Sequence, residues 1–565
     1  MMKRIVIVGG VAGGATAAAR IRRLDENAQI TVFERSGYVS YANCGLPYFI
    51  GGTIKAEDDL VLQSPEGFFE RFRIVVKVRH EVFRIDPASK SVSVRDLENG
   101  NEFDVEYDKL LLSPGAKPII PPIEGINSER IFSLRTVEDT FGIHRFIDSE
   151  KPKSALIVGG GFIGIELAEN LAELGIEVSI VDMQGQVMNQ LDGDMAAFVH
   201  AKLRSKGVKL LLSKSVKAFE TVGSTVKTLL DGGETVSAEM VALAIGVSPD
   251  TALAKDAGIA LGVRGSILVN DRMGTSVEDI YAVGDAVQVK HFITGEPALI
   301  ALAGPANKQG RIAADNICGK HSRYDGSQGS SVIKVFDMTV AATGINEKTA
   351  ATNGIDYEKV FLSSANHAGY YPGGKVMTLK ILFEKETDRL LGAQIVGYDG
   401  VDKRIDVIAT AIRAGMKASE LKNLDLAYAP PYSSAKDPVN MAGFMIENIN
   451  EGIVKQYHWH DVAALPDDGS ISKLDVRTER EYGSGHIEGF INIPVDELRD
   501  RIGEIDRNKP VYVMCQSALR SYIACRILTG RGFDCLNLAG GYRLYSTVIG
   551  DKLAAETAAY CGKEN

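Results

Sequence analysis

The first half of the chain shows the same pattern of hydrophobic and polar positions twice. Residues 3–34 contain an apolar run (KRIVIV), a glycine turn, an Ala-rich segment and a second apolar run (ITVFE) that ends at Glu34. Residues 154–182 repeat this order from SALIV to VSIVD, which ends at Asp182. An apolar strand followed by a Gly-rich turn and a helix predicts a βαβ nucleotide-binding unit. The repeat therefore predicts two dinucleotide sites or an internally duplicated fold.

The rest of the chain changes pattern at Pro- and Gly-rich places. Residues 107–122 are typical of a strand that is followed by a Pro-rich crossover between domains. Residues 240–250 are typical of a matching strand and turn. From about Ser331, strand-like runs alternate with a helical run, and the C-terminal residues form another α/β pattern. We therefore predict an α/β fold with two Rossmann-like dinucleotide-binding domains, at 1–115 with 246–328 and at 116–245, an α+β domain at 329–447, a linker at 448–464 and an α/β domain at 465–563.

Composition and charge disfavour several classes of function. The net charge is −10 and the nine histidines are scattered, which disfavours a nucleic-acid or anionic-membrane partner. No apolar run approaches the roughly 18 residues of a membrane span, and the N-terminus has no signal-peptide pattern. Six largely isolated cysteines do not form a disulfide framework. We expect a cytoplasmic protein, and we predict no metal site.

The second glycine turn carries a complete dinucleotide fingerprint. Gly159 permits the tight turn, Gly161 lets a pyrophosphate approach the backbone, and Gly164 allows close helix–strand packing. Asp182 follows Gly159 by 23 positions, where an acid can bind both ribose hydroxyls. Such an acid disfavours a 2′-phosphate, and no arginine follows directly, so NADH is expected ahead of NADPH. An ordinary strand–helix turn with glycines is the alternative.

The first glycine turn departs from the fingerprint, since Val11 holds its middle position. Glu34 at the end of the next strand supports a nucleotide site here. So does Asp285 in YAVGD, a strand end where a carboxylate can bind a ribityl hydroxyl and a helix N-terminus can meet a phosphate. The glycines of this turn that we expect to bind the cofactor are Gly9, Gly13 and Gly14.

Residues 1 to about 447 resemble the pyridine nucleotide–disulfide oxidoreductases, flavoproteins with two dinucleotide-binding domains. The resemblance implies FAD in the first domain, NAD(P)H in the second, and a C-terminal dimerisation domain. It also implies that Phe162 and Glu166 lie near the isoalloxazine. A packed aromatic residue and a helix-surface acid are the alternative interpretation of this pair.

Cys44 stands alone in SYANCGLPY, and the next cysteine is Cys318. The segment is similar to the single-cysteine branch of that family, which contains NADH peroxidases, NADH oxidases and coenzyme A-disulfide reductases. The peroxidases and oxidases carry a histidine at the position of Ala12, so this sequence favours the coenzyme A-disulfide reductase branch. Reduction of a disulfide needs a second thiol to resolve the mixed disulfide, and the resemblance implies that bound coenzyme A carries it. A buried structural thiol is the alternative.

The resemblance also implies contacts to coenzyme A and a site shared between two subunits. Tyr370 and Tyr428 match tyrosines that reach the partner's active site in a homodimer, where a phenol can protonate the departing thiolate. Surface or packing tyrosines and an ordinary basic helix face are the alternatives. The residues expected to contact coenzyme A or its surroundings are Arg20, Arg23, Ser40, Asn43, Asn307 and Lys436.

The C-terminal domain contains a second candidate sulfur site. In YVMCQSALRS, a strand is followed by Cys515 and by a short loop that closes at Arg520, where successive amides form an anion nest. Together with LDVRTEREYGSGHIEGFINIP and LAGGY, the segment resembles a rhodanese domain from Leu465 to Cys561. A phosphatase is the alternative, although the loop has rhodanese length. Cys318, Cys525, Cys535 and Cys561 are interpreted as structural or incidental.

The sequence therefore predicts an FAD-dependent, NADH-using reductase of coenzyme A persulfide, polysulfide or coenzyme A disulfide, with Cys44 and Cys515 as its sulfur sites. Its partners would be small-molecule thiols, persulfides or disulfides. One alternative is an NADH oxidase or peroxidase with an accessory rhodanese. Another is a sulfur-carrier or redox-sensing module that does not turn over.

Overall fold

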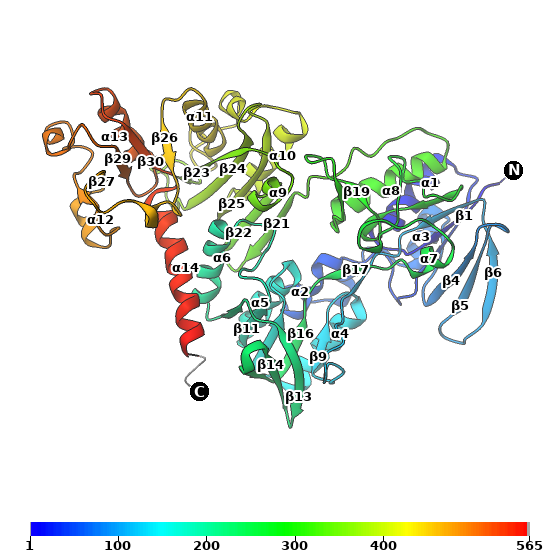
Figure 1. The fold of residues 1–565 in the computed structure, drawn as a ribbon. Helices are drawn as coiled ribbons and strands as arrows, with labels where there is room; N and C mark the ends of the chain where they lie inside the picture. Colours follow the sequence, from blue (N-terminus) through cyan, green and yellow to red (C-terminus); the bar gives the residue numbers. More distant parts are fainter. Residues whose placement is uncertain (1, 562–565) are drawn as a thin grey trace. The chain divides into compact units, whose positions relative to one another are not determined.

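A computed structural model describes residues 2–561, with side chains up to residue 556, and divides the chain into two compact units (Figure 1). Unit 1 comprises the chain up to Gly185 together with Gly207–Gly329. Unit 2 comprises Gln186–Lys206 together with the chain from Ser330 onward. The predicted end of the last domain at 563 lies outside the described residues.

The first predicted βαβ unit belongs to a five-stranded sheet in unit 1 whose strands are all parallel. Ile5 and Ile7 of its central strand pack with α1 and α8, whereas Val6 packs with the strands on the other face. This alternation follows from the two-residue period of a strand, and both faces of a parallel sheet are covered. In sheet order the strands are β18 (Ile280–Ala282), β7 (Lys109–Leu112), β1 (Arg4–Val8), β2 (Gln29–Phe33) and β3 (Val75–Lys77); the helices are α1 (Ala12–Leu24) and α8 (Ala303–Ile317).

The second predicted βαβ unit forms another five-stranded parallel sheet in unit 1. Two short strands that carry the chain between the sheets pair with each other, namely β8 (Ala116–Pro118) and β17 (Val247–Pro249). In sheet order the strands are β12 (Lys209–Leu212), β11 (Glu177–Asp182), β10 (Ser154–Val158), β16 (Met240–Leu243) and β9 (Ile131–Ser133); the helices are α4 (Val137–Glu150) and α5 (Phe162–Glu173). The other elements of unit 1 are α2 (Leu46–Ile50), α3 (Pro65–Phe72), β4 (His80–Asp86), β5 (Ser91–Asp96), β6 (Glu102–Glu106), β13 (Val216–Val222), β14 (Thr225–Leu230), β15 (Thr235–Ala238), α7 (Ala252–Asp256), β19 (Val289–Lys290) and β20 (Pro297–Ala298).

Unit 2 contains an antiparallel sheet and a smaller parallel sheet. The antiparallel sheet consists, in sheet order, of β21 (Ser331–Val335), β22 (Met338–Gly344), β25 (Leu390–Gly397), β24 (Val376–Glu384) and β23 (Tyr357–Ala365), with α6 (Gly193–Ser205), α9 (Glu347–Thr352), α10 (Val401–Arg413) and α11 (Pro438–Asn450). The parallel sheet consists of β26 (Lys455–Tyr457), β30 (Cys535–Leu538), β29 (Val511–Met514), β27 (Ser472–Asp475) and β28 (Ile491–Asn492), with α12 (Glu479–Gly483), α13 (Leu519–Thr529) and α14 (Gly541–Cys561). The predicted α/β and α+β fold classes are confirmed.

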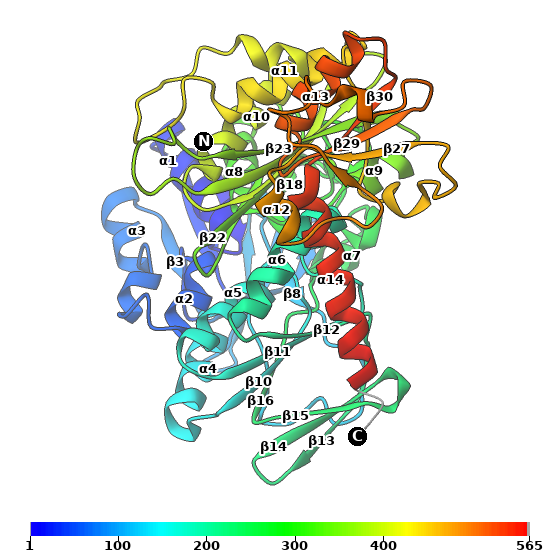
Figure 2. The same ribbon diagram turned by 90° about the vertical axis from the view of Figure 1, so that its left-hand side faces the viewer.

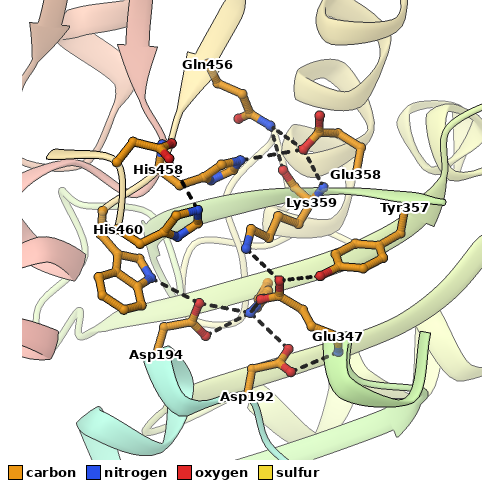
Figure 3. Close-up of polar contacts among 12 residues, drawn as sticks. Asp192, Asp194, Glu347, Tyr357, Glu358, Lys359, Gln456, His458 and His460 are labelled. Carbon is orange, nitrogen blue, oxygen red and sulfur yellow. Dashed lines mark hydrogen bonds and ion pairs between the residues drawn. The ribbon is translucent and has the colours of Figure 1, made fainter. Parts of the chain in front are cut away.

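A buried cluster of charges lies within unit 2 (Figure 3). The Lys380 ammonium is fully buried and pairs with Asp192 at 2.9 Å, with Asp194 at 2.8 Å and with Glu347. Although burial raises the pKa of Glu347, the neighbouring Lys380 and Lys359 lower it to about 2. The three carboxylates are close enough to hold a metal ion, but the Lys380 ammonium already lies between them and compensates part of their charge.

The segment predicted to be a linker is anchored on this cluster. Gln456 Nε2 donates to the Lys359 carbonyl at 2.7 Å, and Trp459 Nε1 donates to Asp194 Oδ2 at 3.4 Å. β26 of the same segment pairs with β30 of the parallel sheet. The segment is therefore hydrogen-bonded to both sheets of unit 2.

The last helix, α14, lies alongside α6 (Figure 2). Asp551 pairs with His200 Nδ1 at 2.8 Å and with Arg204, and the Arg543 guanidinium lies 5.6 Å from the centre of the Phe198 ring. At 21 residues, α14 is the longest helix among the described residues. Neither it nor any other helix within residues 2–561 has the length and apolarity needed to cross a bilayer.

Candidate functional site

The two predicted nucleotide turns have the same local hydrogen bonds. Glu34 accepts from the amide of Gly10 at 2.8 Å, and Asp182 accepts from the amide of Gly160 at 2.7 Å. Each carboxylate also accepts from the amide two positions later, at 3.0 Å for Glu34 and 2.8 Å for Asp182. These bonds fix each acid at the carboxyl end of its strand, beside the glycine turn, where it can bind ribose hydroxyls.

The glycines of the second turn divide into structural and open positions. A Cβ at Gly159 would lie 2.4 Å from the Ala244 carbonyl oxygen, and one at Gly164 would lie 2.0 Å from the Gly159 carbonyl oxygen. A Cβ at Gly161 would meet no protein atom within 4 Å. Packing therefore requires the outer glycines, while the middle one leaves the backbone accessible to a ligand, which fits a pyrophosphate.

Cys44 lies on η1 (Asn43–Gly45), a short 3₁₀ turn directly before α2, and is exposed. The turn leads into α2, and contacts between α2 and α5 hold it in position. One of these contacts is the hydrogen bond from Tyr48 Oη to Glu166 Oε1 at 3.5 Å. Ser40, just upstream, has a left-handed backbone with φ +50°, and the amide of Ser40 donates to the Gly10 carbonyl at 2.9 Å. Cys44 and Glu166 therefore lie near each other. The position of Phe162 and Glu166 beside the isoalloxazine stays a prediction.

The surroundings of Cys44 are acidic. Partial burial of the thiol raises its pKa, and the nearby Glu166 and Asp285 raise it further, while Arg135 lowers it. Burial also raises the pKa of Glu166 to about 7. Arg135 Nη2 donates to Asp285 Oδ2 at 2.8 Å, so the cation near the thiol is shared with a carboxylate. Asp285 lies within the three-residue 3₁₀ turn η5 (Gly284–Ala286). The next element of the described chain is β19, so the helix predicted directly after YAVGD is absent there, and the next α-helix is α8 from Ala303.

The residues of unit 1 expected to bind coenzyme A lie mainly on α1 and α8. Arg20 Nε donates to Asp315 Oδ1 at 2.9 Å, and Arg23 is exposed. Asn307 is exposed on α8 and accepts from Thr16 Oγ1 at 2.5 Å. Arg23 and Asn307 are therefore accessible, whereas one side of Arg20 is occupied by a carboxylate.

The two predicted tyrosines meet in unit 2. Tyr370 Oη and Tyr428 Oη are 2.6 Å apart, both side chains are exposed, and the hydrogen bond raises the pKa of Tyr428. Their loops are held by Arg404, which is fully buried and donates to the Asn366 carbonyl at 2.9 Å and to Asp437 Oδ2 at 2.9 Å. The sequence analysis missed Arg404. The predicted Lys436 is exposed next to Asp437.

Cys515 follows β29 and is fully buried. Ser521 Oγ donates to Cys515 Sγ at 3.2 Å, a contact that the sequence analysis missed although Ser521 directly follows the predicted Arg520. Ala518 within the loop has a left-handed backbone with φ +69° and caps α13. The loop is therefore held in a fixed, turned conformation around the sulfur atom.

Hydrogen bonds from outside the loop fix the direction of its peptide groups. Three carbonyls of the loop accept hydrogen bonds from outside and therefore point outward. The C=O and N–H of a trans peptide point in opposite directions, so the N–H of each of these three peptide groups points into the loop. Such inward amides form an anion-binding concavity. The bonded carbonyls are Cys515 O with Tyr542 N at 2.7 Å, Gln516 O with Arg543 N at 3.0 Å, and Ala518 O with Asn537 Nδ2 at 3.1 Å.

The sequence of the chain matches known families along most of its length. Residues 3–310 match the model of the pyridine nucleotide-disulphide oxidoreductases, residues 330–438 that of their dimerisation domain, and residues 458–547 that of the rhodanese-like domain. A coenzyme A disulfide reductase of Staphylococcus haemolyticus is 37% identical over 449 residues, which are 79% of this chain and 100% of that protein.

Two solved structures cover almost the whole chain. The crystal structure of reduced Bacillus anthracis CoADR-RHD is 47% identical, covers 98% of this chain and 99% of that one, and superposes with a TM-score of 0.95. A NAD-dependent persulfide reductase from A. fulgidus is 38% identical, with 96% and 100% covered and a TM-score of 0.90. The dinucleotide-binding, dimerisation and rhodanese domains predicted from the sequence are thereby confirmed, and the chain belongs to the pyridine nucleotide-disulphide oxidoreductases, an enzyme family whose members use FAD and NAD(P)H.

Proposed function

We propose that the protein is an FAD-dependent, NADH-using reductase of S–S bonds in coenzyme A persulfide, polysulfide or coenzyme A disulfide. The observation that carries this proposal is the exposed Cys44 on a turn directly before α2, which packs against α5. The relatives named coenzyme A disulfide reductase and persulfide reductase support the same substrates. FAD, held beside Glu34 and Asp285, would supply the relay that passes two electrons from the nicotinamide to sulfur.

Cys44 would perform the sulfur chemistry. Its thiolate attacks the sulfur of coenzyme A persulfide that carries the coenzyme A group, the S–S bond breaks, and HS⁻ leaves. The product is a mixed disulfide between Cys44 and coenzyme A. Two electrons and one proton then cleave this bond into the Cys44 thiolate and the coenzyme A thiol. Coenzyme A thus provides the second thiol that the chain lacks beside Cys44.

The remaining predicted residues would bind and orient the substrate. We assign Arg20, Arg23 and Asn307 to the nucleotide part of coenzyme A, and Ser40 and Asn43 to the region of the thiol. Tyr370 and Tyr428 would supply the proton to the departing sulfur from the partner of a homodimer, together with a contact from Lys436. Asp182 would bind both ribose hydroxyls of NADH, which selects it over NADPH.

Cys515 would accept or deliver sulfane sulfur in the rhodanese domain, with the inward loop amides stabilising negative charge on it. We propose a cytoplasmic location, where thiols stay reduced.

The test is Cys44→Ser in the full-length protein with FAD bound. We expect NADH oxidation with coenzyme A persulfide to fall to the background rate, while the flavin absorbance is retained. Mass spectrometry of the wild-type protein should show coenzyme A attached to Cys44. Substantial persulfide turnover by the serine variant would contradict the proposal, and rapid oxygen or peroxide reduction with little sulfide release would favour an oxidase or peroxidase.

A further inference from the structure

The two arginines beside the Cys515 loop are each paired with a carboxylate. Arg520 donates through both terminal nitrogens to Glu481, at 2.7 Å each. This bond lowers the pKa of Glu481 to about 2, so the carboxylate is charged throughout the neutral range. Arg477 is buried and donates to Asp475 from Nη2 at 2.7 Å and from Nε at 3.0 Å. The four side-chain charges therefore sum to zero.

We infer that Glu481 determines which class of sulfur donor the Cys515 loop accepts. Glu481 neutralises the positive charge of Arg520. The loop therefore selects organic persulfides, in which an organic thiol carries the sulfane sulfur, and disfavours oxyanion donors such as thiosulfate. The inference rests on the proposed role of Cys515 in sulfane sulfur transfer. It names the donor class, and Glu481 acts through Arg520 without touching the donor.

The charges of the two donors explain the selection. Arg520 is the only cationic residue between Cys515 and the end of the loop, and its ion pair with Glu481 occupies both of its terminal nitrogens. A helix N-terminus carries about half a positive charge, so the inward amides of the loop compensate only part of the negative charge that a donor adds. A thiolate that meets thiosulfate brings three negative charges together at the reacting sulfur atoms. A thiolate that meets the protonated –S–SH group of a persulfide brings one.

Both reactions conserve atoms and electrons, but they differ in the charge that the loop must hold. With a persulfide, Cys–S⁻ attacks the outer sulfur of R–S–SH, the S–S bond breaks, and R–S⁻ leaves from Cys–S–SH. With thiosulfate, Cys–S⁻ attacks the sulfane sulfur of S–SO₃²⁻, and sulfite leaves from Cys–S–S⁻. The thiosulfate reaction requires the loop to hold a dianion before sulfite departs. Neither arginine offers an uncompensated positive charge to that dianion, because each is paired with a carboxylate.

The rim of the loop fits an organic donor. Leu519 and Ile523 are 54% and 41% exposed, and they lie four positions apart on α13, hence on one face. Exposed large apolar residues on the first two turns offer contact to the carbon chain of a thiol. They offer nothing to thiosulfate, which is small and fully hydrated.

The experiment measures sulfur transfer to cyanide as thiocyanate, in full-length FAD-bound Cys44→Ser protein so that the reductase site does not consume the persulfide. The donors are glutathione persulfide and thiosulfate, with the protein-free rate subtracted. We expect kcat/KM for the persulfide to exceed that for thiosulfate by about 100-fold. In Glu481→Gln, which frees the Arg520 charge, this ratio should fall about tenfold, through a lower KM for thiosulfate. That change should shrink at 1 M salt.

The matched control is Glu479→Gln, which removes an exposed charge from the same helix, α12, and should leave the ratio unchanged. A merely structural role of Glu481 would lower kcat for both donors and leave the ratio and its salt dependence unchanged. Comparable wild-type rates for both donors, or equal effects of the two glutamine variants, would overturn the inference. Failure of the proposed reductase would appear separately, as absent NADH oxidation by the protein that retains Cys44.

Discussion

Cys44 and Cys515 are both candidate sulfur sites, but their surroundings are opposite. Cys44 is exposed on a three-residue turn, and partial burial together with Glu166 and Asp285 raises its pKa. Cys515 is fully buried, accepts a hydrogen bond from Ser521, and lies in a loop whose amides point inward. The protein around Cys44 thus opposes a thiolate, whereas the Cys515 loop presents a hydroxyl and inward amides to its sulfur.

The difference shows what each site still needs. At Cys44 the nearby cation, Arg135, is shared with Asp285. A thiolate there would depend on groups from elsewhere, such as a bound flavin or the phenols of a partner subunit. The Cys515 loop has its donors and paired charges in one domain. We therefore expect changes outside the rhodanese domain to affect reduction and to spare sulfur transfer.

Reciprocal cysteine variants give the largest expected effect. Cys44→Ser should lower NADH-dependent persulfide reduction at least about 1000-fold, because no other described thiol lies on the turn, while thiocyanate formation from a persulfide is retained. Cys515→Ser should abolish thiocyanate formation and retain NADH-dependent persulfide reduction. The measurements are NADH oxidation and thiocyanate release from the same preparations. Loss of both activities in either variant would show that the sites are not independent.

Arg404→Met tests whether the reductase depends on the tyrosine loops. Removing the guanidinium leaves the buried Asp437 carboxylate with the Lys403 ammonium, 4.0 Å away, as its counter-charge, which costs up to about 3–5 kcal/mol. It also frees the loops that carry Tyr370 and Tyr428. We expect reductase activity to fall about 100-fold and sulfur transfer to change little. Urea unfolding and the two activity assays check this.

The double variant Arg404→Met, Asp437→Asn is the matched control, because it also removes the buried carboxylate. It should recover most of the stability but not the reductase activity. Full recovery of activity would mean that the loops need no fixed position.

Ser521→Ala tests the support given to Cys515. A hydrogen bond to a charged group contributes about 1.5–3 kcal/mol, so sulfur transfer should fall about tenfold or more, with reductase activity unchanged. Ser521→Thr keeps the hydroxyl and should retain most of the rate. An alanine variant as fast as wild type would show that the 3.2 Å contact does not support the sulfur during transfer.

The sequence predicted the local parts of these sites better than the distant ones. Glu34 and Asp182 were predicted because strand, turn and acid follow one another along the chain, and the same geometry appears in both turns. Arg404 and Arg135 were missed because each reaches its site from another element, and no local pattern marks such a residue. Glu481 lay inside a quoted motif, but its bond to Arg520 crosses 39 positions and requires the folded domain.

Glu166→Gln is the smallest expected effect and tests the acidic surroundings of Cys44. Burial raises the pKa of Glu166 to about 7, so this side chain is neutral at pH 6 and charged at pH 8. The ratio of variant to wild-type alkylation rates at Cys44, measured with iodoacetamide on reduced FAD-bound protein, should rise from about 1 at pH 6 to about 3 at pH 8. Because the folded pKa of Glu166 exceeds its ordinary value of 4.5, its contribution to the stability of the wild type should fall as the pH rises from 4.5 to about 7, and the variant should lack this contribution. Glu173→Gln, an exposed charge change on the same helix, is the control; a ratio independent of pH would show that Glu166 does not oppose the Cys44 thiolate.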